Sequence, residues 1–218
     1  MDNGFEIIDD FINKKTLNSI YAEVNKFPIS DNKGGFRNAE KLLKPVNDIA
    51  QSKFILNFAS QYLPASAKLM RAIVFCKTEQ NNWLVPWHQD KTVAVSSKFK
   101  INNWHRWSIK DNIHHVQPPA AVMKEMITIR IHLNNTNREN GCLKIIPKSH
   151  QLEILSQDAI RAITQSQQAT YCEANTGAAL VMRPLLLHSS ERMENQCERS
   201  VLHLEYSSYQ LPKAISWG

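Results

Sequence analysis

The chain has 218 residues, of which 43% are hydrophobic and 21% are charged. This is long enough for one domain with a sizeable core, and the composition excludes collagen-like and disordered classes. The net charge is +6, but the basic residues are scattered, so we do not expect a nucleic-acid partner. The sequence also has neither a membrane-length apolar stretch nor a basic, apolar leader, which predicts a soluble cytoplasmic protein.

Helical periodicity comes first along the chain. Apolar residues recur at three- and four-residue steps over 5–26 and again over 44–62, which predicts two helices. After residue 64 the pattern changes to short segments rich in branched and aromatic residues, which predict strands at 69–77, 126–134, 141–146, 178–182 and 200–206. Helices followed by strands, without regular alternation, indicate an α+β domain or a helix-flanked β sandwich rather than a doubly wound sheet.

We expect a single domain over 1–218, mostly helical over 1–66 and β-rich over 67–218, with an insertion at about 98–123. The insertion has weak periodicity of either kind, which is typical of a lid or binding loop. Its Trp104 and Trp107 either close a substrate pocket or belong to the core. Its His105, His114 and His115 lack regular metal-ligand spacing, so we expect them to be loop histidines.

The most informative short motif is the pair His88 and Asp90. Residues two apart on a strand point to the same face, so both side chains could contact one ion. A second histidine would complete the two-histidine, one-carboxylate set of non-haem Fe(II) oxygenases. His188, which follows an apolar run late in the chain, is the candidate. The short motif alone is more often a surface or hydrogen-bonded pair.

Arginines supply candidate anion contacts. Arg199 begins a predicted strand, where it could bind a carboxylate through two charge-assisted hydrogen bonds. Arg130 lies on the polar face of the 126–134 strand, where it binds either a substrate or co-substrate carboxylate or a structural acid. Arg71, on the strand before the His-x-Asp motif, has the same two interpretations. The four scattered cysteines form no CxxC pair and are expected to be buried, reduced thiols.

From about 83 to 211 the sequence resembles the phytanoyl-CoA dioxygenase family of Fe(II)- and 2-oxoglutarate-dependent oxygenases, and in particular its small bacterial members. The matching motifs, in chain order, are His88-Gln-Asp90, Trp104 through Trp107-Ser-Ile-Lys to His115-Val-Gln-Pro-Pro119, Thr128-Ile-Arg-Ile-His-Leu133, Glu139-Asn-Gly-Cys-Leu-Lys-Ile-Ile-Pro-Lys-Ser-His150, and His188 with Ser190 and Arg199. The resemblance implies a double-stranded β-helix, a jelly-roll or cupin-like barrel with the metal at one open end and helices packed outside.

Carried over residue by residue, the family pattern makes His88, Asp90 and His188 the iron ligands. It makes Arg199, assisted by Ser190, the partner of the distal carboxylate of 2-oxoglutarate. The implied reaction uses O2, releases succinate and CO2, and hydroxylates a small-molecule substrate; Asp90 argues against halogenation, because the related halogenases lack this carboxylate. The alternative from another class is a metal- or anion-binding barrel protein without turnover. The sequence does not indicate the oligomeric state.

Overall fold

The structure is a computed structural model that describes residues 1–27, 34–194 and 198–218. Its strands are β1 (Phe5–Ile8), β2 (Gly35–Arg37), β3 (Lys68–Lys77), β4 (Val85–His88), β5 (Val93–Val95), β6 (His105–Lys110), β7 (Ile113–Gln117), β8 (Met126–His132), β9 (Leu143–Ile145), β10 (Thr170–Cys172), β11 (Ala179–Met182), β12 (His188–Ser190) and β13 (Arg199–Ser207). Its helices are α1 (Lys14–Lys26), α2 (Ala39–Leu42), α3 (Lys44–Ala50), α4 (Lys53–Ser60), α5 (Ala120–Lys124), α6 (Gln157–Ser166) and the 3-10 turn η1 (Ser149–Leu152).

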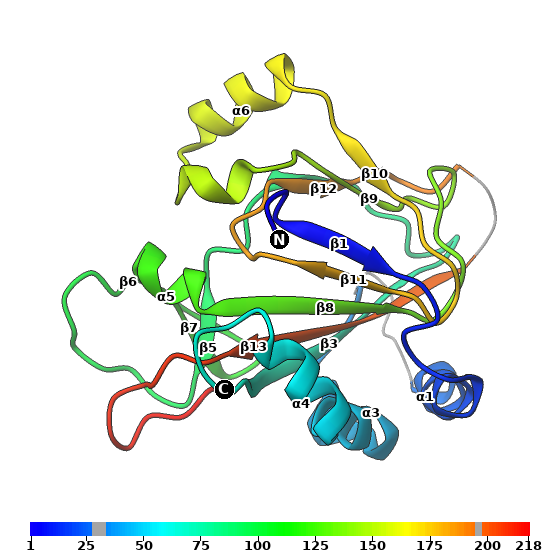
Figure 1. Ribbon diagram of the computed structural model, residues 1–218, viewed down its shortest axis with the longest axis horizontal. Coiled ribbons are helices and arrows are strands. Elements are labelled where there is room, and N and C mark those ends of the chain that lie inside the picture. The colour runs from blue at the N-terminus through cyan, green and yellow to red at the C-terminus, as the bar shows by residue number, and fades with distance from the viewer. Residues whose placement is uncertain (28–33, 195–197) are drawn as a thin grey trace.

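Two antiparallel sheets form the body of the molecule. The larger has the order β1-β11-β8-β13-β3-β2, and the smaller has the order β10-β9-β12-β4. From β8 to β13 the chain passes repeatedly between the two sheets (Figure 1), which is the winding of a double-stranded β-helix. The predicted fold class, mainly β with flanking helices, is confirmed. The sheets remain separate in the described residues, so they do not close into a continuous barrel.

Alternation along the central strands places the core on one side of the larger sheet and the polar residues on the other. On β8, Ile127, Ile129 and Ile131 are fully buried in the main apolar cluster. That cluster also holds buried residues of α1, α3 and α4, the helices that cover this face in Figure 1. Each such isoleucine contributes about 1.5–3 kcal/mol by leaving water. The opposite face of β8 and β13 is therefore free to carry arginine, histidine and glutamate.

The N-terminal segment differs from the helix predicted over 5–26. Residues 5–8 form β1, which pairs with β11 at the edge of the larger sheet, and the helix begins only at Lys14. Asn13 caps that helix by accepting a hydrogen bond from the Thr16 amide at 2.9 Å. The long-range pairing with β11 outweighs the local periodicity that favoured a helix. The helix predicted over 44–62 is divided into α3 and α4, because Ser52 caps a new helix start.

The segment at 98–123 is ordered secondary structure rather than a loop. It contains the β6–β7 hairpin, which forms a small sheet with β5, and the short helix α5. The hairpin turns at Asp111 and Asn112, which both have positive φ, the conformation of a tight hairpin turn. His105 therefore lies on β6 and His114 and His115 lie on β7, so the expectation of loop histidines is wrong.

Two expectations from composition can be compared with this fold. Within the described ranges, no helix is long and apolar enough to cross a membrane; the cytoplasmic location stays a prediction. Cys76, Cys142 and Cys172 are buried free thiols, as expected. Cys197 lies outside the described residues.

Candidate metal centre

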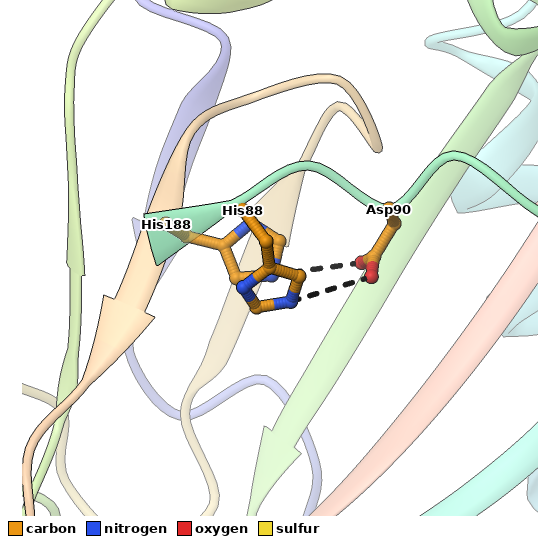
Figure 2. Close-up of side chains that lie close together, drawn as sticks. All are labelled: His88, Asp90 and His188. Atoms are coloured by element: carbon orange, nitrogen blue, oxygen red, sulfur yellow. Dashed lines mark ion pairs between the residues drawn. The ribbon is translucent and has the colours of Figure 1, made fainter. Parts of the chain in front are cut away.

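The three residues of the proposed metal motif meet between β4 and β12. His88 ends β4 and lies opposite His188, the first residue of β12, in the antiparallel register. Asp90 follows two residues after His88, with its carboxylate oxygens 3.8 Å from His88 Nε2 and 3.7 Å from His188 Nε2. Figure 2 shows both imidazole rings directed at this carboxylate. In the described part of the chain, no other cluster of histidine, cysteine or acidic residues has this geometry.

Backbone carbonyls fix the orientation of both rings. His88 Nδ1 lies 2.8 Å from the Pro86 carbonyl, and His188 Nδ1 lies 2.8 Å from the Leu186 carbonyl. A carbonyl oxygen only accepts hydrogen bonds, so Nδ1 carries the proton in each ring. Each Nε2 then offers its lone pair toward Asp90, as in histidines that bind metals.

The electrostatics give these groups the protonation states of metal ligands. Burial lowers the pKa of His188 to about 4, so its ring is neutral at pH 7. Burial raises the pKa of Asp90, but the neighbouring His188 and His88 lower it by more. The pKa of Asp90 therefore lies below its ordinary value. The site offers a neutral imidazole at His188, an ionised carboxylate at Asp90 and the Nε2 of His88, whose Nδ1 is held by the Pro86 carbonyl. This donor set matches that of a divalent transition metal, so the residues present fit an iron ion.

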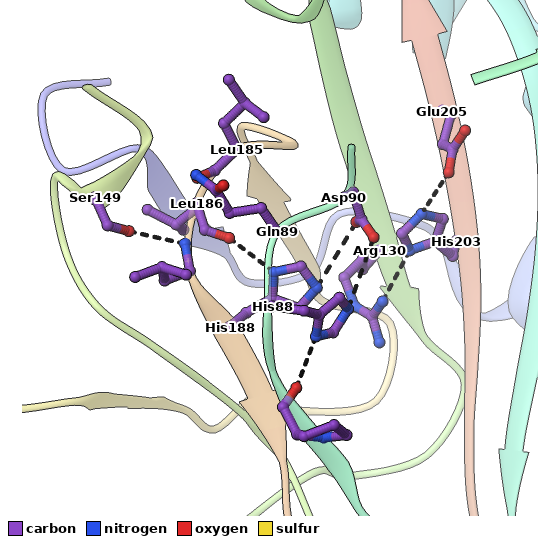
Figure 3. A network of polar contacts seen from close by, with 12 residues as sticks. His88, Gln89, Asp90, Arg130, Ser149, Leu185, Leu186, His188, His203 and Glu205 are labelled. Atoms are coloured by element: carbon purple, nitrogen blue, oxygen red, sulfur yellow. Dashed lines mark hydrogen bonds and ion pairs between the residues drawn. The ribbon is translucent and has the colours of Figure 1, made fainter. Parts of the chain in front are cut away.

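Gln89 anchors the motif from the opposite side of the chain. Its amide nitrogen donates to the carbonyls of Leu185 and Glu153, each at 2.7 Å, and its oxygen accepts from the Leu155 amide at 2.9 Å. Figure 3 shows Gln89 directed toward Leu185 and away from the carboxylate of Asp90. These bonds hold the turn that carries the two ligands of the motif.

The three side chains line a cavity of about 290 Å³ between the two sheets. Its other polar walls come from β3, β7, β8, β12 and β13, and include Arg71, His115, Arg130, Ser190, Arg199, His203 and Glu205. Arg37, Ile73, Phe75 and Trp83 line this cavity and also an adjoining one of about 630 Å³. The metal motif therefore faces a polar pocket that continues into a second, more aromatic space.

Arg199 and Ser190 lie together at one side of this pocket, as expected from the sequence. Arg199 Nη1 donates to the Gly141 carbonyl at 2.7 Å, and Ser190 Oγ donates to the same oxygen at 2.8 Å. Among the described residues, no carboxylate pairs with Arg199, and its Nε has no partner. Burial and the nearby Arg130 lower its pKa to about 9. A buried guanidinium without an acid is costly, which favours binding of an anion here.

The structure separates the two interpretations left open for Arg71 and Arg130. Arg71 donates two hydrogen bonds to Glu205, at 2.7 and 2.9 Å, so it is paired with a structural acid. Arg130 Nη1 instead donates to His203 Nδ1 at 2.8 Å, and its buried Nε has no partner in the structure. His203 is oriented in turn by Glu205, 3.2 Å from its Nε2 (Figure 3). Arg130 is therefore a buried arginine without a carboxylate partner among the described residues, whereas the charge of Arg71 is already compensated by Glu205.

Trp104 and Trp107 do not line either of these cavities. Trp104 is 7% exposed and packs in a second apolar cluster, and both rings contact Phe99. Their predicted role in closing the pocket is not supported, because the β6–β7 hairpin directs them into this cluster. The alternative of core packing describes them better.

Sequence reasoning missed several residues around the pocket. His203 and Glu205 share the face of β13 with Arg199, so strand alternation indicated their position but not their network with Arg71. His115 was assigned to a loop, yet it is 2% exposed, lines the pocket and has an unpartnered Nδ1. Lys77 had no sequence signal; it is fully buried behind Ser190.

Comparison with known proteins identifies the family of this chain. The model of the phytanoyl-CoA dioxygenase family matches residues 1–201. The chain belongs to this family. Membership confirms the predicted enzyme class, the Fe(II)- and 2-oxoglutarate-dependent oxygenases, and the cofactors expected with it. A search of curated proteins gives no match.

Three solved structures of similar fold illustrate the likeness. AviO1 from Streptomyces viridochromogenes Tue57 has a TM-score of 0.71 at 18% identity, with 98% of this chain and 93% of that chain covered. HygX from Streptomyces hygroscopicus, crystallised with nickel, 2-oxoglutarate and hygromycin B, has a TM-score of 0.68 at 12% identity, with 94% and 83% covered. The epimerase SnoN, in complex with Fe3+, alpha ketoglutarate and nogalamycin RO, has a TM-score of 0.71 at 13% identity, with 94% and 79% covered. At these identities the likeness shows a shared fold.

Proposed function

We propose that this oxygenase holds Fe(II) through His88, Asp90 and His188 and hydroxylates a small-molecule metabolite. The observation that carries the proposal is the joint presence, in one pocket, of the preoriented ligand set and of a buried Arg199 without an acid partner. Three protein ligands leave positions on the metal for a keto acid and for oxygen. When bound, iron and 2-oxoglutarate supply the oxidising chemistry, in which the keto acid and O2 are converted to succinate and CO2 as the substrate is oxidised.

The side chains of the pocket bind and orient the reactants. Arg199, with Ser190, binds the distal carboxylate of 2-oxoglutarate through charge-assisted hydrogen bonds. The Nδ1 bonds of His88 and His188 keep both Nε2 atoms directed at the iron position. The network of Glu205 and His203 fixes Arg130, which lines the pocket and has no carboxylate partner among the described residues, so its guanidinium can bind an anionic group of the substrate.

A small molecule is the substrate class that the pocket supports best. HygX and SnoN were crystallised with hygromycin B and nogalamycin RO, which are small molecules. The pocket of this chain adjoins a second cavity through shared walls, so a substrate longer than the pocket itself has room beside the metal. Asp90 occupies the carboxylate position of the ligand set, which favours hydroxylation over halogenation.

The first test is an anaerobic titration of the Fe(II)-loaded protein with 2-oxoglutarate. We expect the weak visible charge-transfer band of a chelated keto acid, and a weaker band in Arg199→Ala. Absence of the band in a folded, iron-loaded protein would contradict the proposed co-substrate site. Retention of the full affinity in Arg199→Ala would remove Arg199 from that site.

The metal assignment has its own test. Asp90→Ala and His188→Ala each remove one ligand from a three-ligand set, so we expect both variants to lose iron binding while circular dichroism shows an unchanged fold. Turnover of 2-oxoglutarate by the double variant would contradict the assignment. A wild-type protein that binds both Fe(II) and 2-oxoglutarate but never consumes the keto acid would instead support a binding protein without turnover.

A further inference from the structure

Lys77, the last residue of β3, is a buried cation next to the proposed co-substrate site. Its side chain is fully buried, and its Nζ donates to Ser190 Oγ at 2.8 Å and to the backbone carbonyl of Glu191. It lies 5.3 Å from the centre of the Trp83 ring. Among residues 1–27, 34–194 and 198–218, no carboxylate pairs with it. Burial of an ammonium group with only neutral acceptors is costly, so this position is expected to gain from a bound anion.

Lys77 and Arg199 converge on the same small set of atoms. They are direct register partners on β3 and β13. Lys77 donates to the Ser190 hydroxyl, which donates to the Gly141 carbonyl, and Arg199 donates to that same carbonyl. The two basic side chains are thus satisfied by one hydroxyl and two peptide oxygens, those of Gly141 and Glu191, all of which are neutral acceptors. A carboxylate placed at the pocket side of Ser190 and Arg199 would supply the missing negative charge to both.

We propose that Lys77 is a positioning residue for 2-oxoglutarate, which acts through Ser190 and through its own charge to hold the distal carboxylate. The proposal rests on the proposed function. Because Lys77 donates to Ser190 Oγ, the single serine proton is directed away from Lys77 and toward the Gly141 carbonyl, which also accepts from Arg199, so Lys77 holds Ser190 in place beside Arg199. The ammonium adds a second positive charge behind Arg199, in a site where burial strengthens electrostatic interactions.

The charge of Lys77 is sensitive to the arrival of an anion. Burial and the positive charges of Arg199, Arg130 and Arg192 lower the pKa of Lys77 to about 7. Cys142 is a neutral thiol at pH 8, because burial raises its pKa to about 11, and the carboxylate of the contacting residue Glu191 is paired with Lys144. A carboxylate beside Ser190 would stabilise the ammonium and raise this pKa. Binding of 2-oxoglutarate above pH 7 is therefore expected to take up a proton.

The experiment compares two keto acids on the full-length Ni(II)-loaded protein by isothermal titration calorimetry. 2-Oxoglutarate carries the distal carboxylate, and 2-oxovalerate has the same chain length without it. In Lys77→Met we expect the dissociation constant for 2-oxoglutarate to rise about tenfold to a hundredfold, the loss of one charge-assisted interaction. The constant for 2-oxovalerate should stay unchanged, and Lys77→Arg should keep part of the 2-oxoglutarate affinity.

Lys144→Met is the matched control. Lys144 is also a poorly exposed lysine near a tryptophan ring, 5.6 Å from the centre of Trp87, but its ammonium group pairs with the Glu191 carboxylate and not with the Ser190 hydroxyl. We expect this variant to bind both keto acids as the wild type does. Equal weakening of both ligands in Lys77→Met, or no weakening of either, would overturn the proposal.

A second measurement needs no substitution at Lys77. Titration of the wild type with 2-oxoglutarate at pH 8, in buffers of different ionisation enthalpy, should show proton uptake that is absent with 2-oxovalerate. Lack of proton uptake would overturn the role of Lys77 even if Lys77→Met does not fold. Failure of the proposed function has a different signature, because the wild type would then bind neither keto acid in the presence of metal.

Discussion

Removing the charge of Arg71 tests whether this pocket arginine is structural. Arg71 and Glu205 are 9% and 5% exposed, and two hydrogen bonds of 2.7 and 2.9 Å join them. Burial raises the pKa of Glu205, but Arg71 and His203 together lower it to about 2. A fall from 4.5 to about 2 corresponds to roughly 3 kcal/mol of stabilisation, at 1.36 kcal/mol per pKa unit. Arg71→Met would leave Glu205 with only the contact from His203.

We expect Arg71→Met to lower the free energy of unfolding by about 3–5 kcal/mol, the usual cost of leaving a buried charge unpaired. Urea denaturation of Arg71→Met, Glu205→Gln and the double variant measures this cost. The double variant should lose less than the sum of the two single variants, because the neutral glutamine no longer needs the guanidinium. Single losses below about 1 kcal/mol, or additive losses, would refute the reasoning.

The remaining predictions concern the turn at Gly141, acid stability and the insertion. Gly141→Ala should destabilise the protein by more than about 1 kcal/mol and weaken 2-oxoglutarate binding. The φ of Gly141 is +71°, and an added Cβ would lie 2.5 Å from the Glu191 carbonyl oxygen. Urea denaturation measures the loss of stability, and calorimetry measures the loss of binding. Acid titration followed by circular dichroism should show that the protein loses stability as pH falls from about 4.5 toward 2. The pKa of Glu205 is lower in the folded than in the unfolded protein, so the stabilisation that its carboxylate provides is complete only above pH 4.5. Trp104→Ala should lower the free energy of unfolding by about 3–5 kcal/mol without changing 2-oxoglutarate affinity, because Trp104 is buried in an apolar cluster. A change in that affinity without a loss of stability would instead indicate that Trp104 contributes to the pocket.

Local patterns predicted the parts of the site that depend on short chain segments. A strand turns successive side chains to opposite faces, so the alternation over 126–134 correctly separated the core residues from Arg130. The same rule predicted that His88 and Asp90 share one side of a strand; the structure brings the two side chains together, although β4 ends at His88 and Asp90 lies beyond it. The helix over 5–26 was wrong at its start, because β1 exists only through its pairing with β11.

The sequence by itself determined the binary pattern of the sheets, the residue types of the metal motif and, by resemblance, the family. Only the tertiary structure decided which charges face each other. Arg71, Arg130 and Arg199 look alike as strand arginines, yet Glu205 pairs with the first and no described carboxylate pairs with the other two. Partners in a β-helix come from strands far apart in the chain, so charge compensation, and with it the place of Lys77 behind Ser190, depends on long-range register that no local spacing encodes.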